Sequence, residues 1–389
     1  MKTSADSPSA FNGYFDNGAT SFPKPVQVAE EMTRYLNEIG GPYGRSFYNR
    51  AVEVSRIVET TRDMLADILN VEAAENIVFT PNATHAINIV LNGLDLNDSE
   101  VWISALEHNA ILRPIHQLKK EKNIKVRFLP SDIDGRINIE QLKKMSGNPA
   151  LIIINHQSNI NGVIQPIAEI KSYFKNAKIL IDGSQSVGHI PIYLDKWDID
   201  FLAFTGHKSL LGPPGTGGLY VKSPHLLPAL ILGGTGSNSE SSTMPVFAPD
   251  KYEAGTPNIT GIFGLYGALN NKPKPAHSHQ DFKNMISQIE TIKNYHLYRA
   301  NNPDDQGELF SLTHKYLDCA ELGLELYTKA GIETRVGLHC SPLAHKKLGT
   351  FPNGTVRIAP SVYHRVEDFT KLVDTLNQID KEYAARKEV

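Results

Sequence analysis

Short apolar segments alternate with amphipathic stretches along much of the chain, and this alternation constrains the fold more than any other feature. We expect strands at residues 76–80, 100–104, 125–129, 150–155, 178–181, 200–204 and 218–221. We expect helices at 26–36, 52–69, 111–119 and 167–174, where apolar residues recur at helical spacing. Strands that alternate with helices form mainly parallel sheets with helices on their faces. The sequence therefore predicts an α/β fold with a large, mainly parallel sheet.

A change of composition at residues 271–279 indicates where a second region begins. The stretch NKPKPAHSH has no apolar periodicity and is typical of a linker or an exposed loop. Beyond it, helices expected at 281–293 and 318–330 alternate with short strands. We therefore expect a smaller α+β region there. At the other end, the polar residues 1–13 are typical of a loose tail.

Composition excludes several classes of function. The chain has 389 residues, of which 41% are apolar and 21% charged, as in ordinary globular proteins. A formal net charge of -3 argues against a nucleic-acid surface and a polybasic membrane patch. No apolar run approaches the ~18 residues of a membrane span, and the first residues lack the apolar core of a secretory signal. Two cysteines make no disulfide framework, so we expect a protein of the reducing cytoplasm.

Side chains capable of chemistry follow five of the expected strands. Ligands of open α/β sheets bind beyond the carboxyl ends of the strands, so this is where such residues matter. They are Thr84, His108, Asn159, Asp182 with Gln185, and the run Thr205, His207 and Lys208. Taken singly, each allows a plainer interpretation: Thr84 and Asp182 as helix N-caps, His108 as a structural histidine, and Asn159 as part of a polar loop. Their coincidence at successive strand ends is what predicts a site.

These residues together meet the needs of pyridoxal 5′-phosphate (PLP). A lysine can bind its aldehyde, and a carboxylate can keep its pyridine nitrogen protonated, so that the ring withdraws electrons from a substrate α-carbon. The first turn of a helix near Thr84 favours a phosphate. The glycine-rich stretch at 212–218 lacks the Gly-Lys-Ser/Thr ending of a nucleotide loop. We therefore predict a PLP enzyme in which Lys208 carries the cofactor.

With these residues in view, the chain resembles the class V aminotransferase family, and within it the cysteine desulfurase-like proteins that carry a His-Cys loop. The resemblance runs from Tyr14 to about Tyr363. Its motifs are YFDNGATSFPKP, PNATHAIN, EHNAILRP, SNINGVIQPI, IDGSQSVG, FTGHKSLLGPPGTGG, YEAGTPN and GLHCSPLAHKKLGTFPNGTVR. It implies the fold-type I architecture of PLP enzymes. The large PLP-binding domain would span 20–255 and the small α+β domain 256–389, with residues 1–19 packed on the small domain.

The resemblance also implies roles for individual residues. Lys208 matches the Schiff-base lysine, Asp182 the partner of the pyridine nitrogen, and Gln185 the contact of the phenolic oxygen. His108 matches the histidine stacked on the ring, and Asn159 the asparagine beside ring and substrate. The phosphate contacts would be Thr84, Thr205, His207 and the backbone of Ala83, with Thr256 reaching in from the second subunit of a homodimer. Arg357 matches the arginine that pairs with the substrate carboxylate, a role that suits a planar guanidinium.

Cys340 matches the nucleophile of the desulfurases. It lies in a loop beside His339, His345, Lys346 and Lys347, and we expect these positive neighbours to favour its thiolate. Cys319 lies instead in the apolar-rich segment LDCAELGLELY, which indicates a packing role. The implied reaction converts the small amino acid L-cysteine to L-alanine and leaves a persulfide on Cys340, from which a sulfur-acceptor protein would take the sulfur.

Two departures from the family leave the substrate open. The segment 358–365 lacks the Asn-Thr pair that more often follows the aromatic residue, and the region 270–298 is short and polar. A selenocysteine lyase, an aminotransferase, or another amino-acid lyase or epimerase is therefore an alternative. An aminotransferase would not need Cys340. A PLP-fold scaffold or sensor is disfavoured because Lys208, Asp182 and His108 are all present.

Overall fold

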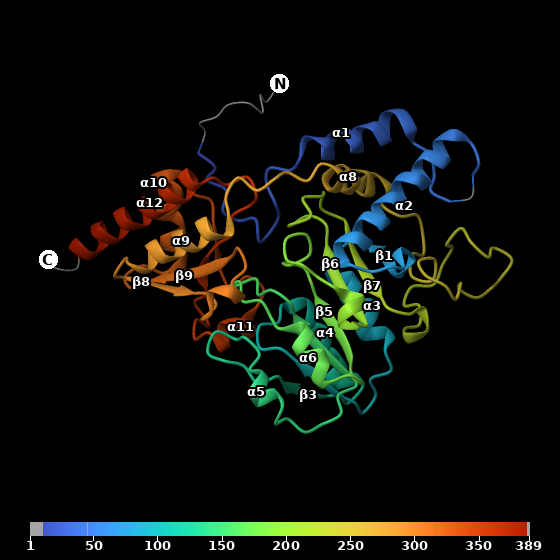
Figure 1. Cartoon of the computed structure of the whole chain (residues 1–389), viewed down its shortest axis with the longest axis horizontal. Coiled ribbons are helices and arrows are strands. Elements are labelled where there is room, and N and C mark those ends of the chain that lie inside the picture. Colours follow the sequence, from blue (N-terminus) through green and yellow to red (C-terminus); the bar gives the residue numbers. More distant parts are fainter. Residues whose placement is uncertain (1–10, 45, 387–389) are drawn as a thin grey trace.

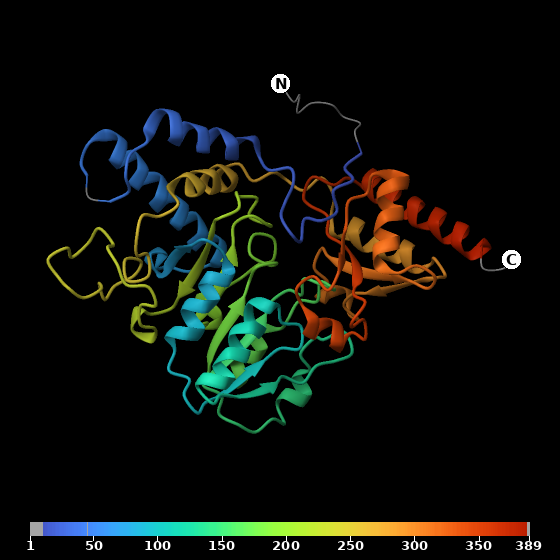
Figure 2. The same cartoon turned by 180° about the vertical axis from the view of Figure 1, so that it is seen from behind.

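A computed structural model describes residues 11–44 and 46–386 of the chain. The loose tail expected at 1–13 therefore falls almost wholly outside the described residues, as does the first half of the expected segment 1–19. Two bodies are visible, a large sheet with its helices and a smaller sheet at the other end of the molecule (Figure 1 and Figure 2). Within 11–44 and 46–386, no helix has both the length and the apolar character needed to cross a bilayer.

The first body holds a seven-stranded sheet in the order β1-β7-β6-β5-β4-β2-β3. Its strands are β1 (Ile77–Thr80), β2 (Glu100–Ile103), β3 (Lys125–Phe128), β4 (Leu151–Asn155), β5 (Lys178–Asp182), β6 (Phe201–Thr205) and β7 (Gly217–Val221). β7 runs antiparallel to both of its neighbours, and the pairs from β6 to β3 are parallel. All seven expected strands are confirmed, and the sheet is mainly parallel, as predicted.

Helices cover both faces of this sheet. They are α1 (Val26–Arg34), α2 (Asn49–Leu69), α3 (Ala83–Gly93), α4 (Asn109–Glu121), α5 (Ile139–Leu142), α6 (Ile167–Tyr173), α7 (Leu194–Trp197) and α8 (Ile259–Asn270). Along β4, Ile153 joins the core formed with α3 and α4, whereas Ile152 and Ile154 join the core formed with α2 and α6. A strand buried on both faces needs no polar alternation, which explains the continuous apolar run of β4.

The second body is a four-stranded antiparallel sheet in the order β10-β11-β9-β8. Its elements are β8 (Tyr295–Tyr298), β9 (Phe310–His314), β10 (Arg335–Gly337), β11 (Thr355–Ile358), α9 (His279–Glu290), α10 (Cys319–Ala330), α11 (Pro342–Lys347) and α12 (Val366–Ala385). Phe15 is buried in the core that this sheet shares with α9, α10 and α12. Tyr14 and Asp16 form bridges to Glu333 and Ala359. The N-terminal segment thus packs against the small sheet.

Helix α8 lies with the large sheet rather than with the small one. Ile259, Ile262 and Phe263 share a buried cluster with Val54 and Ile57 of α2, and Figure 1 shows α8 beside α1 and α2. The chain then crosses to the small sheet through residues 271–278, which form no helix or strand. The stretch expected as a linker does connect the two bodies. The division at 255/256 stays a prediction, but the packing of α8 favours a change after residue 270.

Candidate active site

Residues at the carboxyl ends of β4, β5 and β6 line a cavity of about 220 Å³, together with the first turn of α3. The register places Asn155 of β4 directly opposite Asp182 of β5. Most of the residues expected at the site line this cavity: Ala83, Thr84, His108, Asn159, Asp182, Gln185, Thr205, His207 and Lys208. The other lining residues are Ala19, Asn82, Ala110, Asn155 and Ser184. Asn155 was missed in the sequence, although as the last residue of its strand it occupies the same position as Asp182.

Lys208 and Asp182 supply a cation and an anion to the same cavity. Lys208 is half-buried three residues beyond the end of β6. Burial and the charge of Arg357 lower the pKa of its amine to about 8, against the opposing effect of Asp182. Asp182 is buried, and its Oδ1 accepts hydrogen bonds from the backbone N–H of Ser184 at 3.0 Å and from its hydroxyl at 2.5 Å. Asp182 is therefore held in place, while the amine of Lys208 gives up its proton easily.

His108 is fixed by its own helix. It is the N-cap of α4, and its Nδ1 accepts a hydrogen bond of 3.0 Å from the backbone N–H of Ala110. Burial lowers the pKa of the imidazole, so the ring is uncharged near neutral pH. Because Nδ1 accepts, the single ring proton lies on Nε2. His108 thus presents a neutral ring to the cavity in a defined orientation.

The part of the cavity lined by the first turn of α3 suits an anion. The Asn82 side chain caps α3 by accepting from the backbone N–H of His85 at 2.9 Å, which leaves the N–H groups of Ala83 and Thr84 without helix partners. His207 lines the same cavity, and its buried Nδ1 has no hydrogen-bond partner among the described residues. A helix N-terminus attracts negative charge, and an unpartnered buried nitrogen needs a ligand. An anion-binding part, an amine and a carboxylate in one cavity fit PLP.

A buried acid lies beside the site. Glu107 is fully buried, and its Oε1 accepts from the Ser104 hydroxyl at 2.7 Å and from the Asn155 N–H at 2.8 Å. Its Oε2 has no partner among the described residues. Burial raises the pKa of this carboxyl to about 8, and the nearby charge of Asp182 adds to the effect. Glu107 is therefore a neutral acid at pH 7. The sequence marked it only as the neighbour of His108.

Arg357 of β11 is buried behind the cavity. Its Nη2 donates to Oδ1 of Asp16 at 2.7 Å, and its Nη1 donates to the backbone oxygen of Asn159 at 3.3 Å. A Cβ on Gly18 would lie 2.9 Å from the guanidinium carbon of Arg357, so the residue there must be small. Arg357 does not line the cavity of Lys208, but its contact with Asn159 places it against the wall.

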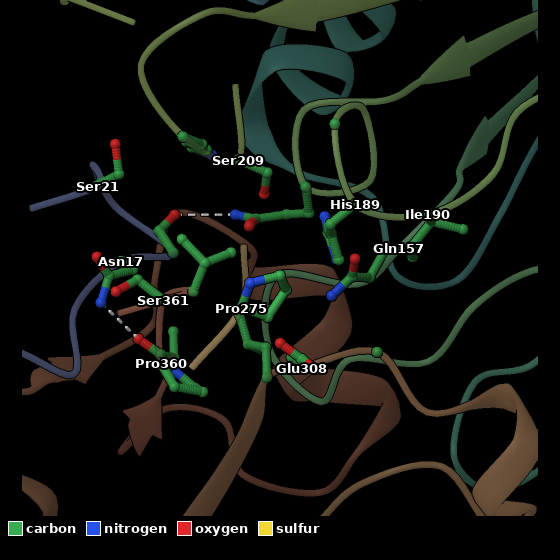
Figure 3. Close-up of a pocket in the computed structure, with 18 of the residues that line it drawn as sticks. Asn17, Ser21, Gln157, His189, Ile190, Ser209, Pro275, Glu308, Pro360 and Ser361 are labelled. Atoms are coloured by element: carbon green, nitrogen blue, oxygen red, sulfur yellow. Dashed lines mark hydrogen bonds between the residues drawn. The ribbon is translucent and has the colours of Figure 1, made fainter. Parts of the chain in front are cut away.

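The N-terminal segment also separates two cavities. Gln185 donates a hydrogen bond from Nε2 to the backbone oxygen of Gly18 at 2.9 Å. Asn17 donates from Nδ2 to the backbone oxygen of Ala359 at 3.0 Å. Behind these bonds, a second cavity of about 800 Å³ lies between the two bodies. Figure 3 shows Asn17 beside Pro360 and Ser361 on one wall of it, with Gln157 and Glu308 on another. Gln185 and Lys208 line both cavities.

Cys340 lies next to the site but outside the cavity lining. Its side chain is exposed, and its backbone oxygen accepts a hydrogen bond of 2.8 Å from the N–H of Asn109, the residue after His108. Arg335 of β10 approaches the sulfur, with 3.8 Å between Nη2 and Sγ. The other cysteine, Cys319, is half-buried at the start of α10, and its thiol donates to Asn353. Cys340 is therefore the cysteine that the fold brings to the site.

The prediction that positively charged neighbours surround Cys340 was wrong for the two histidines. His339 and His345 are buried, and burial lowers their pKa values to about 2 and about 4, so both rings are neutral. Lys347 donates to the backbone of Ser131. Arg335, which the sequence did not single out, is the positive group that contacts the thiol.

Thr256 is exposed and lines neither cavity of its own chain.

Comparisons with known proteins agree with this geometry. The model of the family described as aminotransferase class V matches residues 13–372. A probable cysteine desulfurase of Pyrococcus abyssi is 31% identical, over 95% of this chain and 94% of that protein. A cysteine desulfurase of Escherichia coli is 30% identical, over 95% and 93%. The solved apo structure of a cysteine desulfurase from Thermococcus onnurineus has a TM-score of 0.87 at 27% identity, over 95% of this chain and 94% of that one.

The raised pKa of Glu107 predicts a pH-dependent stability. A carboxyl whose pKa rises from 4.5 to about 8 on folding stabilises the fold fully below pH 4.5, and this contribution is lost as the pH rises toward 8. Glu107→Gln does not titrate and keeps an acceptor for Ser104 and Asn155. We expect the variant to gain stability over the natural chain by about 1 kcal/mol per pH unit across this window, measured by denaturant unfolding. Glu75→Gln, at an exposed position, is the control. If the unfolding free energies of Glu107→Gln and the natural chain differ by the same amount at every pH, the raised pKa of Glu107 is contradicted.

Proposed function

The chain belongs to the class V aminotransferase family, and from this premise we propose that it is a PLP-dependent cysteine desulfurase that converts L-cysteine to L-alanine. The relatives that bear this name match it over almost its whole length. The observation that carries the proposal is the position of Cys340. Its backbone is hydrogen-bonded to the residue that follows His108, at the edge of the cavity that contains Lys208 and Asp182. A thiol at that position serves a desulfurase and has no task in amino-group transfer.

The chain's own residues suit the cofactor. When bound, PLP withdraws electrons from the α-carbon of an amino acid. Lys208 would hold its aldehyde carbon, Asp182 its ring nitrogen and His108 one face of its ring. Gln185 would contact the phenolic oxygen, and Asn159 would lie beside ring and substrate. The first turn of α3 at Ala83 and Thr84, with Thr205 and His207, would hold its phosphate.

Three groups of the chain would act on the substrate. Arg357 would bind the carboxylate, sharing its guanidinium with Asp16. The Nζ of Lys208, whose pKa is about 8, would take the α-proton near neutral pH. The thiolate of Cys340 would attack the substrate sulfur. In that step a sulfur–sulfur bond forms and the carbon–sulfur bond breaks, its electron pair staying on carbon. That carbon then takes a proton, Lys208 returns a proton to the α-carbon, and the products are alanine and a persulfide on Cys340.

The exposed position of Cys340 also supports transfer of the sulfur to an acceptor protein, because a persulfide there is accessible from solvent. Both cysteines are free thiols in the structure. Thiols that must stay reduced suit a reducing compartment. We therefore place the enzyme in the cytoplasm as part of the proposal.

We propose a homodimer with shared active sites. Thr256 lies near the end of a long stretch, residues 227–258, with no helix or strand. This stretch exposes large apolar side chains, Leu230, Ile231, Leu232, Val246 and Phe247. Several large apolar side chains exposed along one stretch support the proposal that another chain covers it. In such a dimer, Thr256 would reach the phosphate site of the partner subunit.

The first prediction concerns the lysine. Borohydride reduction of the PLP-loaded protein, followed by peptide mass spectrometry, should find the cofactor on Lys208. Lys208→Ala should abolish attachment while the fold persists. Lys24→Ala is a matched control, since burial also lowers the pKa of Lys24 to about 8 but its side chain lies outside the cavity. Attachment to any other lysine would overturn the assignment.

The second prediction concerns the nucleophile. Cys340→Ala should lower alanine production from L-cysteine at least ~100-fold, because no other group can take the sulfur. Binding of L-cysteine, followed in the absorbance spectrum, should persist. Cys319→Ala should keep full turnover and cost roughly 1 kcal/mol of stability. Full turnover by Cys340→Ala, or transamination of another amino acid with no desulfuration, would refute the desulfurase and leave the PLP site standing.

The third prediction concerns the partner subunit. Thr256→Ala should weaken PLP binding about tenfold, the usual cost of a hydrogen bond to a charged group. Thr243→Ala, exposed on the same irregular stretch, should not. Titration of cofactor into each variant measures the change. A monomer in sedimentation that still binds the cofactor tightly would disprove the shared site.

A further inference from the structure

The loop that carries Cys340 has an unfavourable backbone. His339 has a φ of 47° and Cys340 a φ of 58°, so two successive residues with a Cβ occupy the left-handed region. This region is costly for residues other than glycine, and two in a row persist only where the surroundings hold them. The position of the thiol therefore depends on contacts from outside the loop.

Asn159 supplies two side-chain contacts from the large-sheet body. Its Nδ2 donates to the backbone oxygen of His339 at 2.9 Å, and its Oδ1 accepts from the hydroxyl of Ser341 at 2.8 Å. One amide thus binds the residues on both sides of Cys340. The third contact is the Asn109 N–H, 2.8 Å from the oxygen of Cys340 itself. These three contacts come from the large-sheet body, whereas Thr355 and Arg335 contact the same loop from within the small body.

The same asparagine faces the cofactor cavity. Asn159 lines it, is 6% exposed, and accepts on its backbone oxygen from Arg357. An amide offers two N–H donors and two acceptor lone pairs. The loop uses one of each, which leaves one N–H and one lone pair for a ligand in the cavity. A ligand that binds Asn159 therefore acts on the group that holds the loop.

We propose that Asn159 is a positioning residue that holds the Cys340 loop in its strained conformation and couples that conformation to occupancy of the cavity. The coupling to turnover rests on the proposed desulfurase function. The hold on the loop does not, so the two are tested separately. We call the Asn159 amide with its hydrogen bonds to His339 and Ser341 the clamp. Ser341 is the most informative position to change, because it is fully buried and forms one bond of the clamp without lining the cavity.

The first test is hydrogen exchange in the full-length, PLP-loaded protein. Ser341→Ala removes one of the two side-chain bonds and should speed exchange of the amides at residues 338–341, and of Asn109, about fivefold. Asn159→Ala removes both and should speed it about 25-fold. Ser186→Ala changes another fully buried serine, whose hydroxyl contacts His156 and Gly183, and should leave these amides unchanged. Unchanged exchange in Asn159→Ala, or equal loosening by Ser186→Ala, would contradict the hold of Asn159 on the loop.

The second test is turnover of L-cysteine. Ser341→Ala should lower kcat about fivefold with KM and cofactor affinity unchanged, because it alters the thiol and not the binding groups. Ser341→Thr, which keeps the hydroxyl, should recover part of the loss. If Ser341→Ala keeps the full kcat while Cys340→Ala is inactive, the loop conformation is not coupled to turnover. This would refute the coupling even where hydrogen exchange had shown that Asn159 holds the loop. If the proposed desulfurase function is wrong, the natural chain shows no turnover of L-cysteine. The hydrogen-exchange result would still test whether Asn159 holds the loop.

Discussion

The parallel register of the central strands is the constraint on which the site depends. β4 and β5 pair so that Asn155 lies opposite Asp182, and β6 continues the same edge. Strands buried on both faces cannot slip without exposing apolar residues or burying polar ones. The chemistry at the strand ends is therefore fixed by the packing of cores such as those of Ile152 and Ile153, which take no part in the reaction.

Burial then decides which groups carry charge. It lowers the pKa of Lys208, raises that of Glu107 and keeps His108 neutral. The same burial neutralises His339 and His345 beside the thiol. The positive charge at Cys340 therefore comes from Arg335, on the edge strand β10, where the guanidinium stays half-exposed. Burial thus lowers the pKa of the Lys208 amine, and the guanidinium of Arg335 lies beside the Cys340 thiol.

The two bodies meet at Asn159, between Arg357 and the loop of Cys340. The large sheet holds the residues that we propose bind the cofactor, and the fold is the fold-type I architecture of PLP enzymes shared with the solved desulfurase. The small body supplies Arg357 and Cys340, to which the proposal assigns carboxylate binding and nucleophilic attack. The N-terminal segment closes the junction, since Asp16 binds Arg357 and the oxygen of Gly18 accepts from Gln185.

The sequence by itself determined the strands, the sheet class and the residues at the strand ends, because these follow from local periodicity and from the rule that ligands bind at one edge. Its motifs also marked Cys340 and Arg357. Only the tertiary structure decided that α8 packs with the large sheet, that His339 and His345 are neutral, and that Arg335 contacts the thiol. It alone shows Asn159 holding residues about 180 positions away. Charge state and long-range hydrogen bonds depend on burial, and burial depends on segments distant in sequence, so no local pattern can encode them.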